Sequence, residues 1–307
     1  DRIESRGLGD VYKRQVGVAN ARPGSQRNTH YNLTDNEASL LQNDPRVFAV
    51  ELKPELRDDI YMEAMTTQSG NFTKTSLDTG DYINWGLRRM NSIVNPYIGN
   101  NVTGGYDHTL DGTGVDIVIQ DSGIQVDHPE FYIAGTTTSR VKQIDWYTSS
   151  GLPGTQNALF YRDLDGHGTH VASTAAGVLH GWAKGAEIYA IKVNGLEGSG
   201  DGGTGMPVSD CFDVIKEWHK SKPINPATGV KRPTIVNMSW GYFGYFSGIT
   251  GGNYRGIGWS GTARRADYGM IGRFNGFGYT FGKRVASVDV DMEELIDAGV
   301  IVCTAAG

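Results

Sequence analysis

Short apolar runs alternate with amphipathic segments through the second half of the chain. The runs are strand-sized, and they lie at 115–119, 186–193, 234–239 and 300–303. Among them, apolar residues recur at helical spacing, and this spacing predicts helices over 167–179, 209–220 and 289–298. Strands that alternate with helices are typical of a mostly parallel sheet with helices on both faces, so the pattern predicts an α/β fold.

A shorter α+β pattern lies near the start of the chain. Thr34 and Glu37 have the spacing of a capping box, which predicts a helix over 37–42. The Asp-Pro pair at 44–45 ends this helix, because the residue before a proline avoids the helical region. Residues 46–52 alternate between apolar and polar and predict a strand.

These patterns divide the chain into parts. Residues 1–15 resemble translated adaptor sequence and are interpreted as a non-native scar, with a natural basic tail as the alternative. The small α+β unit covers 16–60, and 61–84 form a polar linker. The α/β region covers 85–307. It is interrupted at about 241–283 by residues rich in Gly, Tyr, Phe and Arg, and a structureless loop of that length is unusual in a compact domain.

Composition narrows the class of protein further. The chain has 307 residues, 38% of them hydrophobic and 20% charged, and a net charge of −6, which argues against a nucleic-acid partner. No apolar run approaches the roughly 18–20 residues of a membrane span, and no signal peptide is visible. Cys211 and Cys303 are expected to be buried free thiols rather than a disulfide.

Two residues have the positions and chemistry of a catalytic pair. Asp121 follows the predicted strand at 115–119, and His167 opens a predicted helix. Ligands gather at the carboxyl ends of parallel strands, so we expect both side chains in one region. A neutral imidazole can take a proton from a serine hydroxyl, while a buried carboxylate fixes its tautomer. Gly166 and Gly168 would let the backbone pass close to this pair.

Other interpretations of the same region stand beside this one. Asp121 alone could be a turn or helix-cap residue. His167 and His170 could bind a metal, but no third ligand follows at zinc spacing, so we favour His170 as a packed structural residue. Asp163 and Asp165 are interpreted as solvated loop acids that could instead bind a cation.

Two long motifs carry a family resemblance. Residues 120–124 read Gln-Asp-Ser-Gly-Ile and are followed by His-Pro-Glu-Phe at 128–131, and residues 165–172 read Asp-Gly-His-Gly-Thr-His-Val-Ala. Together they resemble the aspartate and histidine motifs of the subtilisin-like (S8) serine proteases, in the same order. The resemblance implies a subtilisin-like fold, a polypeptide substrate, Asp121 as the orienting acid and His167 as the general base.

The same resemblance implies three substrate-binding segments. They are an edge segment that pairs with an extended peptide, one wall of the primary specificity pocket, and the opposite wall. The edge segment consists of Gly198, Ser199 and Gly200. The first pocket wall consists of Ser239, Trp240 and Gly241, and the opposite wall of Ala305, Ala306 and Gly307. The family usually has a smaller apolar residue and a second glycine where this chain has Trp240 and Tyr242, so the shape of the pocket departs from the family pattern.

The resemblance also implies parts that the 307 residues lack. The family's oxyanion asparagine would follow Gly307 directly, and its Gly-Thr-Ser-Met-Ala segment would follow later; neither is present. Ser239 and Ser260 lie in other contexts, so no nucleophile is assigned. We therefore expect a catalytic domain that is incomplete at the C-terminus and inactive alone. The alternative is a natural non-catalytic relative that binds peptides or serves as a structural component.

The remaining expectations rest on the same resemblance. The helix, Asp-Pro turn and strand of the first unit resemble the end of an inhibitor-type propeptide, which implies that 16–60 are a propeptide remnant and an intramolecular inhibitor. The interruption at about 241–283 is interpreted as an insertion near the substrate cleft, or as a surface hairpin with no role in binding. Secretion is the family's usual setting. Catalysis needs no cofactor; structural calcium is plausible, but no ligands are assigned.

Overall fold

A computed structural model describes residues 17–64, 86–87, 110–133, 135–245, 251–254, 256–260, 273–274 and 279–305. The chain divides into two compact units. The first consists of Asp1–Glu63, Trp240–Glu294 and Ala306–Gly307, and the second of Ala64–Ser239 and Leu295–Ala305. The boundaries expected from the sequence at 15, 60 and 84 remain predictions.

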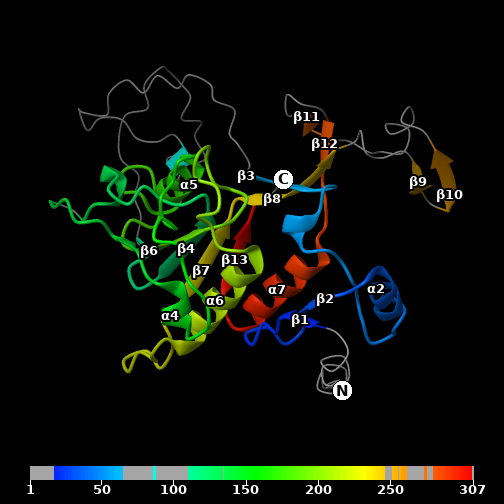
Figure 1. The fold of residues 1–307 in the computed structure, drawn as a ribbon. Coiled ribbons are helices and arrows are strands. Elements are labelled where there is room, and N and C mark those ends of the chain that lie inside the picture. Colours follow the sequence, from blue (N-terminus) through cyan, green and yellow to red (C-terminus); the bar gives the residue numbers. More distant parts are fainter. Residues whose placement is uncertain are drawn as a thin grey trace. The chain divides into compact units, whose positions relative to one another are not determined.

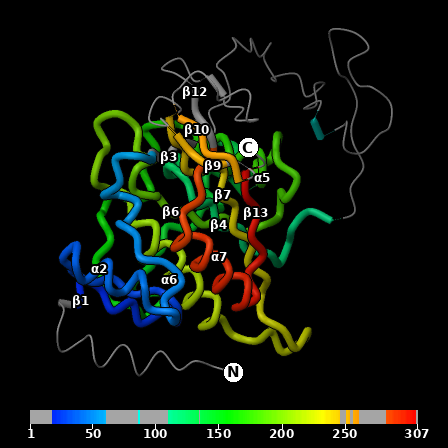
Figure 2. The backbone as a smooth tube through the Cα atoms, turned by 90° about the vertical axis from the view of Figure 1, so that its right-hand side faces the viewer, coloured from blue at the N-terminus to red at the C-terminus, as the bar shows by residue number. Residues whose placement is uncertain are grey.

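The second unit is built on a five-stranded parallel sheet (Figures 1 and 2). Its strand order is β13-β7-β4-β6-β5, and every neighbouring pair is parallel. The strands are β4 (Asp116–Asp121), β5 (Val141–Lys142), β6 (Glu187–Lys192), β7 (Thr234–Met238) and β13 (Ile301–Thr304). The alternating pattern in the sequence therefore correctly predicted a mostly parallel α/β sheet.

Helices cover both faces of this sheet. The main ones are α4 (Trp146–Ser150), α5 (His167–Ala176) and α6 (Val208–Ser221), with a short 3₁₀ helix, η3, at Pro129–Phe131. On one face, Ile188 and Ala190 of β6 belong to a core cluster with Ala172 and Ala176 of α5. On the other, the ring of Tyr189 lies 4.7 Å from that of Trp218 in α6. Successive strand residues thus pack against different helices, as the pleat requires.

The first unit contains a different sheet, in which β12 pairs antiparallel with both β11 and β8. Its strand order is β11-β12-β8-β3, and two hairpins, β1-β2 and β9-β10, lie outside it. The bounds are β1 (Gly17–Asn20), β2 (His30–Asn32), β3 (Tyr61–Ala64), β8 (Trp240–Tyr245), β9 (Gly251–Tyr254), β10 (Ile257–Ser260), β11 (Arg273–Phe274) and β12 (Tyr279–Gly282). The interruption expected at about 241–283 therefore contains short strands in its described parts.

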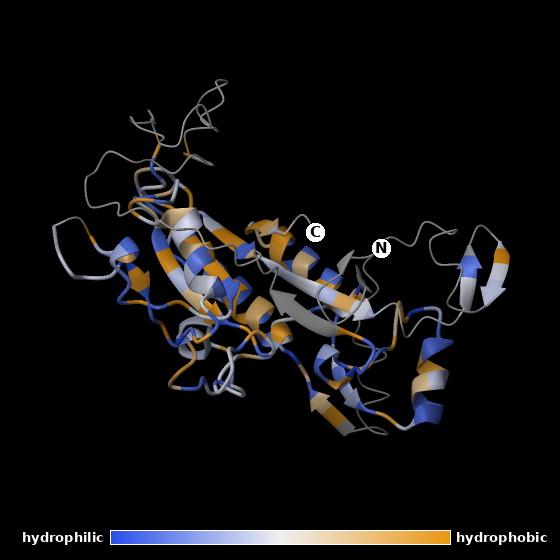
Figure 3. Ribbon diagram, turned by 90° about the horizontal axis from the view of Figure 1, so that it is seen from above, coloured by the Kyte–Doolittle hydropathy of each residue, from blue (hydrophilic) through white to orange (hydrophobic). Residues whose placement is uncertain are grey.

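The predicted capping box is present. Thr34 Oγ1 accepts from the backbone N–H of Glu37 at 3.4 Å, and the Glu37 carboxylate accepts from the N–H of Thr34 at 2.8 Å. The helix that follows, α2, covers Asp35–Gln42 and has both hydrophilic and hydrophobic residues (Figure 3). The hydrogen bonds from Thr34 lower the pKa of Glu37. This cap gives the helix a defined start.

The strand predicted over 46–52 is wrong, because these residues form a turn and an irregular segment. The Asp44 carboxylate accepts from the N–H of Arg46 at 2.9 Å and also pairs with its guanidinium. Val47 N–H donates to the Asp44 carbonyl at 3.0 Å, which closes the turn. Phe48 and Leu52 are exposed, so the alternation does not mark a buried face.

Residues near the start of the chain are bound to α7 (Ala286–Asp297), a helix far along the sequence. The guanidinium of Arg22 donates to Asp291 at 3.0 Å, and both side chains are almost fully buried. Glu294 accepts from Ser25 Oγ and from the N–H groups of the next two residues. The six residues from Arg22 to Arg27 are thus joined, within the first unit, to a helix that lies 267 to 269 positions later in the sequence.

Two further expectations concern cysteines and membranes. Both cysteines are free thiols, as predicted, but only Cys211 is buried. Cys303 is exposed because β13 is an edge strand of its sheet. Within the part of the chain that the structure describes, no helix is long and apolar enough to cross a membrane.

Candidate active site

The sheet brings the two predicted catalytic residues together. Asp121 is the last residue of the central strand β4, and His167 is the first residue of α5. His167 Nδ1 lies 2.8 Å from Asp121 Oδ1. The Asp121 side chain is 0% exposed and that of His167 is 11% exposed, so their interaction is screened little by water. A carboxylate on Nδ1 favours the tautomer with its proton there, which leaves Nε2 to exchange a proton with a reactant.

The Asp121 carboxylate is held by its own neighbour. The N–H of Ser122 donates to Asp121 Oδ1 at 2.7 Å, and Ser122 is completely buried. The N–H of Gly168, one residue after His167, donates to Ser122 Oγ at 2.9 Å. Ser122, which follows Asp121, is therefore hydrogen-bonded to Gly168, which follows His167, and this contact connects the two motifs.

Gly168 is required by close approach of the backbone. A Cβ on this residue would lie 2.1 Å from the carbonyl oxygen of Gly123 and 3.2 Å from Asp121 Oδ1. The expected close approach is thus confirmed at Gly168. Gly166 differs, because a Cβ there would meet nothing within 4 Å, and its φ of +87° is what favours glycine.

Asp163 is not the solvated loop acid that the sequence suggested. Its Oδ1 accepts from Ser122 Oγ at 2.9 Å and from the N–H of Gly166 at 2.8 Å. Its Oδ2 accepts from Thr169 twice, from N–H at 2.9 Å and from Oγ1 at 2.6 Å. An acidic residue just before a predicted helix is a signal for such a helix-capping role. Asp165 is exposed, as a loop acid would be, and among the described residues its carboxylate accepts from the His167 N–H alone, at 3.3 Å.

His170 is exposed rather than packed, so that expectation was wrong. The buried residues of α5 are Gly168, Ala172 and Ala176, which are four residues apart and form one stripe. His170 lies halfway between two of them, on the opposite side of the helix. Among the described residues, no three His, Cys, Asp or Glu side chains gather in a cluster that could hold a metal ion.

The expected edge segment lies directly against the loop that leads to His167. A Cβ on Gly198 would come within 2.4 Å of the Asp165 nitrogen and the Leu164 carbonyl carbon. Ser199 and Gly200 form a turn, and Asp201 follows with its side chain fully buried. This arrangement places the segment beside the base.

The two expected pocket walls are only partly described. The N–H of Ala305 donates to the Met238 carbonyl at 3.0 Å, so Ala305, which directly follows β13, lies beside the end of β7, the strand that ends before Ser239. Ser239 Oγ accepts from Asn237 Nδ2 at 2.9 Å. Trp240 and Gly241 belong to β8 of the first unit, and Ala306 and Gly307 lie outside the described residues.

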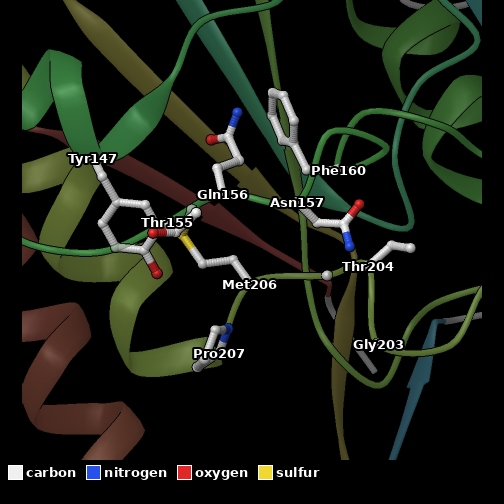
Figure 4. Close-up of a pocket in the computed structure, with 10 residues that line it drawn as sticks. Tyr147, Thr155, Gln156, Asn157, Phe160, Gly203, Thr204, Met206 and Pro207 are labelled. Atoms are coloured by element: carbon white, nitrogen blue, oxygen red, sulfur yellow. The ribbon is translucent and has the colours of Figure 1, made fainter.

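A separate cavity of about 310 Å³ lies between two loops of the second unit (Figure 4). It is lined by Tyr147, Thr155, Gln156, Asn157, Phe160, Gly203, Thr204, Gly205, Met206 and Pro207. The Tyr147 hydroxyl donates to Asp210 Oδ2 at 2.7 Å, and burial followed by this hydrogen bond raises the pKa of Tyr147. Neither Asp121 nor His167 lines this cavity, so it is distinct from the carboxylate–imidazole pair.

Fold and site together define an α/β protein with a parallel sheet, at whose carboxyl end a buried carboxylate contacts an imidazole. Comparison with known families identifies the lineage: residues 112–307 match the model of the subtilase family. The chain belongs to the subtilase family of serine peptidases.

Individual relatives agree with this assignment. The extracellular serine proteinase of Thermus sp. (strain Rt41A) is 28% identical over 245 residues, which are 78% of this chain and 47% of the relative. The alkaline serine exoprotease A of Vibrio alginolyticus is 29% identical over 210 residues, 68% of this chain and 31% of the relative. The chain thus spans half or less of the length of these relatives.

A solved structure is also similar. The crystal structure of a cold adapted subtilisin-like serine proteinase matches with a TM-score of 0.41 and 22% sequence identity, and the match covers 73% of this chain and 56% of that chain.

Proposed function

We propose that the protein is a serine endopeptidase that cleaves polypeptides through an Asp–His–Ser triad, in which Asp121 is the orienting acid and His167 the general base. The observation that carries this proposal is the 2.8 Å contact between His167 Nδ1 and the fully buried Asp121 carboxylate. Family membership supports the reaction class.

The proposed chemistry follows from this pair. His167 Nε2 would take the proton of a serine hydroxyl as the oxygen attacks the scissile carbonyl carbon, and the imidazolium would then donate that proton to the leaving amine. The Asp121 carboxylate would hold the ring in the required tautomer and stabilise its positive charge. Replacing such an acid by its amide typically lowers kcat about 10⁴-fold, because the tautomer becomes wrong.

The serine of the proposed triad has no counterpart in the 307 residues, since the family's Gly-Thr-Ser-Met-Ala segment does not occur. We expect the purified 307-residue chain to hydrolyse no peptide. Turnover of a fluorogenic peptide by this chain, blocked by a serine-directed inhibitor and lost in His167→Ala, would contradict this expectation.

A second candidate is a non-catalytic relative that binds peptides or has a structural role. Sequencing the gene past the codon of Gly307 separates the two candidates. An asparagine codon at once, followed later by a Gly-Thr-Ser segment, supports the peptidase, whereas a stop codon supports the non-catalytic relative. If the longer gene product exists, Asp121→Asn should lower its kcat by the factor given above.

Substrate binding is part of the proposal. An extended peptide would add as a strand along Gly198–Gly200, because this segment lies against the loop that carries the base. The pocket walls would be Ser239–Gly241 and Ala305–Gly307, as the family resemblance implies. Within the second unit, the hydrogen bond from the Ala305 N–H to the Met238 carbonyl supports the proximity of Ala305 to Ser239.

The role of the first residues and the location are also proposals. We propose that residues 16–60 act as an intramolecular inhibitor, which would make the chain a zymogen form. Secretion is supported by the Thermus relative, whose name describes an extracellular enzyme. Adding a separate peptide of residues 16–60 to the active gene product tests the first proposal; inhibition is expected, and unchanged turnover would contradict it.

A further inference from the structure

Asp163 is the acceptor at the centre of a hydrogen-bond network around the acid–base pair, although it contacts neither member's reacting atoms. Of its four donors within the described residues, Ser122 Oγ comes from the end of β4, and the other three come from Gly166 and Thr169 at the start of α5. One carboxylate therefore holds the segment that carries Asp121 and the segment that carries His167.

Ser122 connects this carboxylate to the pair itself. Its hydroxyl donates to Asp163 Oδ1 and accepts from the Gly168 N–H, and its own N–H donates to Asp121 Oδ1 at 2.7 Å. A second connection runs from the Gln125 N–H to Thr169 Oγ1 at 2.8 Å, and Thr169 in turn donates to Asp163. The path from Asp163 to the orienting carboxylate is thus continuous and short.

The charge of Asp163 strengthens each of these contacts. Hydrogen bonds to an ionised acceptor are roughly twice as strong as neutral ones, and an anion is stabilised at the positive end of a helix such as α5. An amide could not replace the carboxylate, because it has one accepting oxygen and one donating nitrogen. That nitrogen would face either the Gly166 N–H or the Thr169 N–H, and neither of these can accept.

We propose that Asp163 is a positioning residue, which sets the placement of His167 against Asp121 by holding Ser122 and the first turn of α5 on one carboxylate. The proposal rests on the proposed function, because it assigns a role within the Asp121–His167 pair. It predicts that removing the acceptor disturbs the contact between His167 Nδ1 and Asp121 while the sheet stays folded.

The test is a proton NMR measurement on the 307-residue chain, which needs no nucleophile. A proton held between His167 Nδ1 and a carboxylate gives a low-field resonance, and its loss in His167→Gln assigns it. Asp163→Asn is expected to move this resonance upfield or abolish it, while circular dichroism shows a folded chain. Ser122→Ala removes only the connecting hydroxyl and should have the same effect, and it keeps the test decisive if Asp163→Asn fails to fold.

Two matched control variants test whether the effect of Asp163→Asn on the resonance comes only from the loss of a negative charge or only from the loss of a helix cap. Asp165→Asn removes the same charge two residues away, where the carboxylate accepts a single hydrogen bond of 3.3 Å. Asp145→Asn alters another capping carboxylate of the same unit, which accepts from the Thr148 N–H at 2.9 Å at the start of α4. Both variants should keep the low-field resonance at its wild-type position.

Two results would overturn the proposal. One is a resonance unchanged in both Asp163→Asn and Ser122→Ala; the other is an equal loss in Asp165→Asn, which would make charge rather than hydrogen bonding the cause. Absence of the resonance from the wild-type chain is a different failure, because it would remove the acid–base pair and with it the proposed function.

Discussion

Gly168 shows how closely the backbone packs behind the acid–base pair. Gly168→Ala would place a methyl group 2.1 Å from the Gly123 carbonyl oxygen and 3.2 Å from Asp121 Oδ1. The backbone would have to move, and such overpacking typically costs about 1–3 kcal/mol of stability. We expect this loss in urea unfolding, together with an altered His167 resonance. Gly202→Ala is the control, because a Cβ there meets nothing within 4 Å; equal losses in both variants would contradict the prediction.

His219 gives a residue-scale prediction about pH. Burial lowers its pKa, and the charges of Lys222 and Lys231 lower it further against the opposing effect of Asp116. As the pH falls, His219 is therefore protonated in the unfolded chain, with a pKa of about 6.5, before it is protonated in the folded chain. The contribution of His219 to stability is complete above about pH 6.5 and declines below it. Stability curves measured against pH should decline less steeply in His219→Gln, and an unchanged slope would refute this.

The sequence could predict that Asp121 and His167 lie together, because each belongs to a long motif at the end of a recognisable element. It could not predict the hydrogen bonds of Asp163, because one of their donors, Ser122, lies 41 positions earlier in the sequence. The prediction that His170 is packed was wrong because the buried face of α5 is formed by small residues, Gly168, Ala172 and Ala176. Such residues contribute little to the hydrophobic pattern from which a buried face is predicted.

At the scale of elements, a buried lysine joins the end of β6 to the loops around it. Lys192 lies beside Asp121 in the register of the parallel sheet, and its ammonium donates to the Asp201 carboxylate and the Arg162 carbonyl. Arg162 also pairs with Asp201. This cluster joins the turn after Gly198–Gly200 to the loop before His167.

Lys192→Met should therefore be strongly destabilising. Removing one partner leaves the buried Asp201 charge poorly compensated, and such changes typically cost about 3–5 kcal/mol. Lys142 supplies the control, because its ion pair with Glu187 lies on the same sheet but is 44% and 35% exposed at its two side chains. Lys142→Met should cost at most about 1 kcal/mol. Similar midpoints for the two variants in urea unfolding would contradict this reasoning.

Elements with strong periodicity were predicted well from the sequence. The four strands and three helices of the α/β pattern are all present, and their ends differ from expectation by a few residues. The strand expected over 46–52 did not form because local hydrogen bonds to Asp44 close a turn at its start.

At the scale of the whole molecule, the first unit joins segments from opposite ends of the sequence. Its ion pair between Arg22 and Asp291 spans 269 positions of the chain, and its members are 1% and 3% exposed. Hydrophobic and polar periodicity reports only local structure. The division of the chain predicted from the sequence therefore contained no contact between residues 16–60 and residues near 291.

The Arg22 pair yields a prediction with a control from the same contact region. Arg22→Met removes the cationic member of this buried ion pair and should cost about 3–5 kcal/mol. Arg27 pairs with Glu293 of the same helix, but the two side chains are 49% and 65% exposed. Arg27→Met should change stability by no more than about 1 kcal/mol. Thermal unfolding of both variants checks the difference, and equal Tm values would count against it.

The place of β4 in its sheet has a consequence for how the acid–base pair responds to thermal motion. β4 is bonded to β6 on one side and to β7 on the other, so Asp121 belongs to the segment whose amides should exchange with solvent most slowly. His167 begins a helix, where fraying starts. Transient opening of the first turn of α5 would detach the imidazole while the carboxylate keeps its place, so the pair can be lost and regained without unfolding of the sheet.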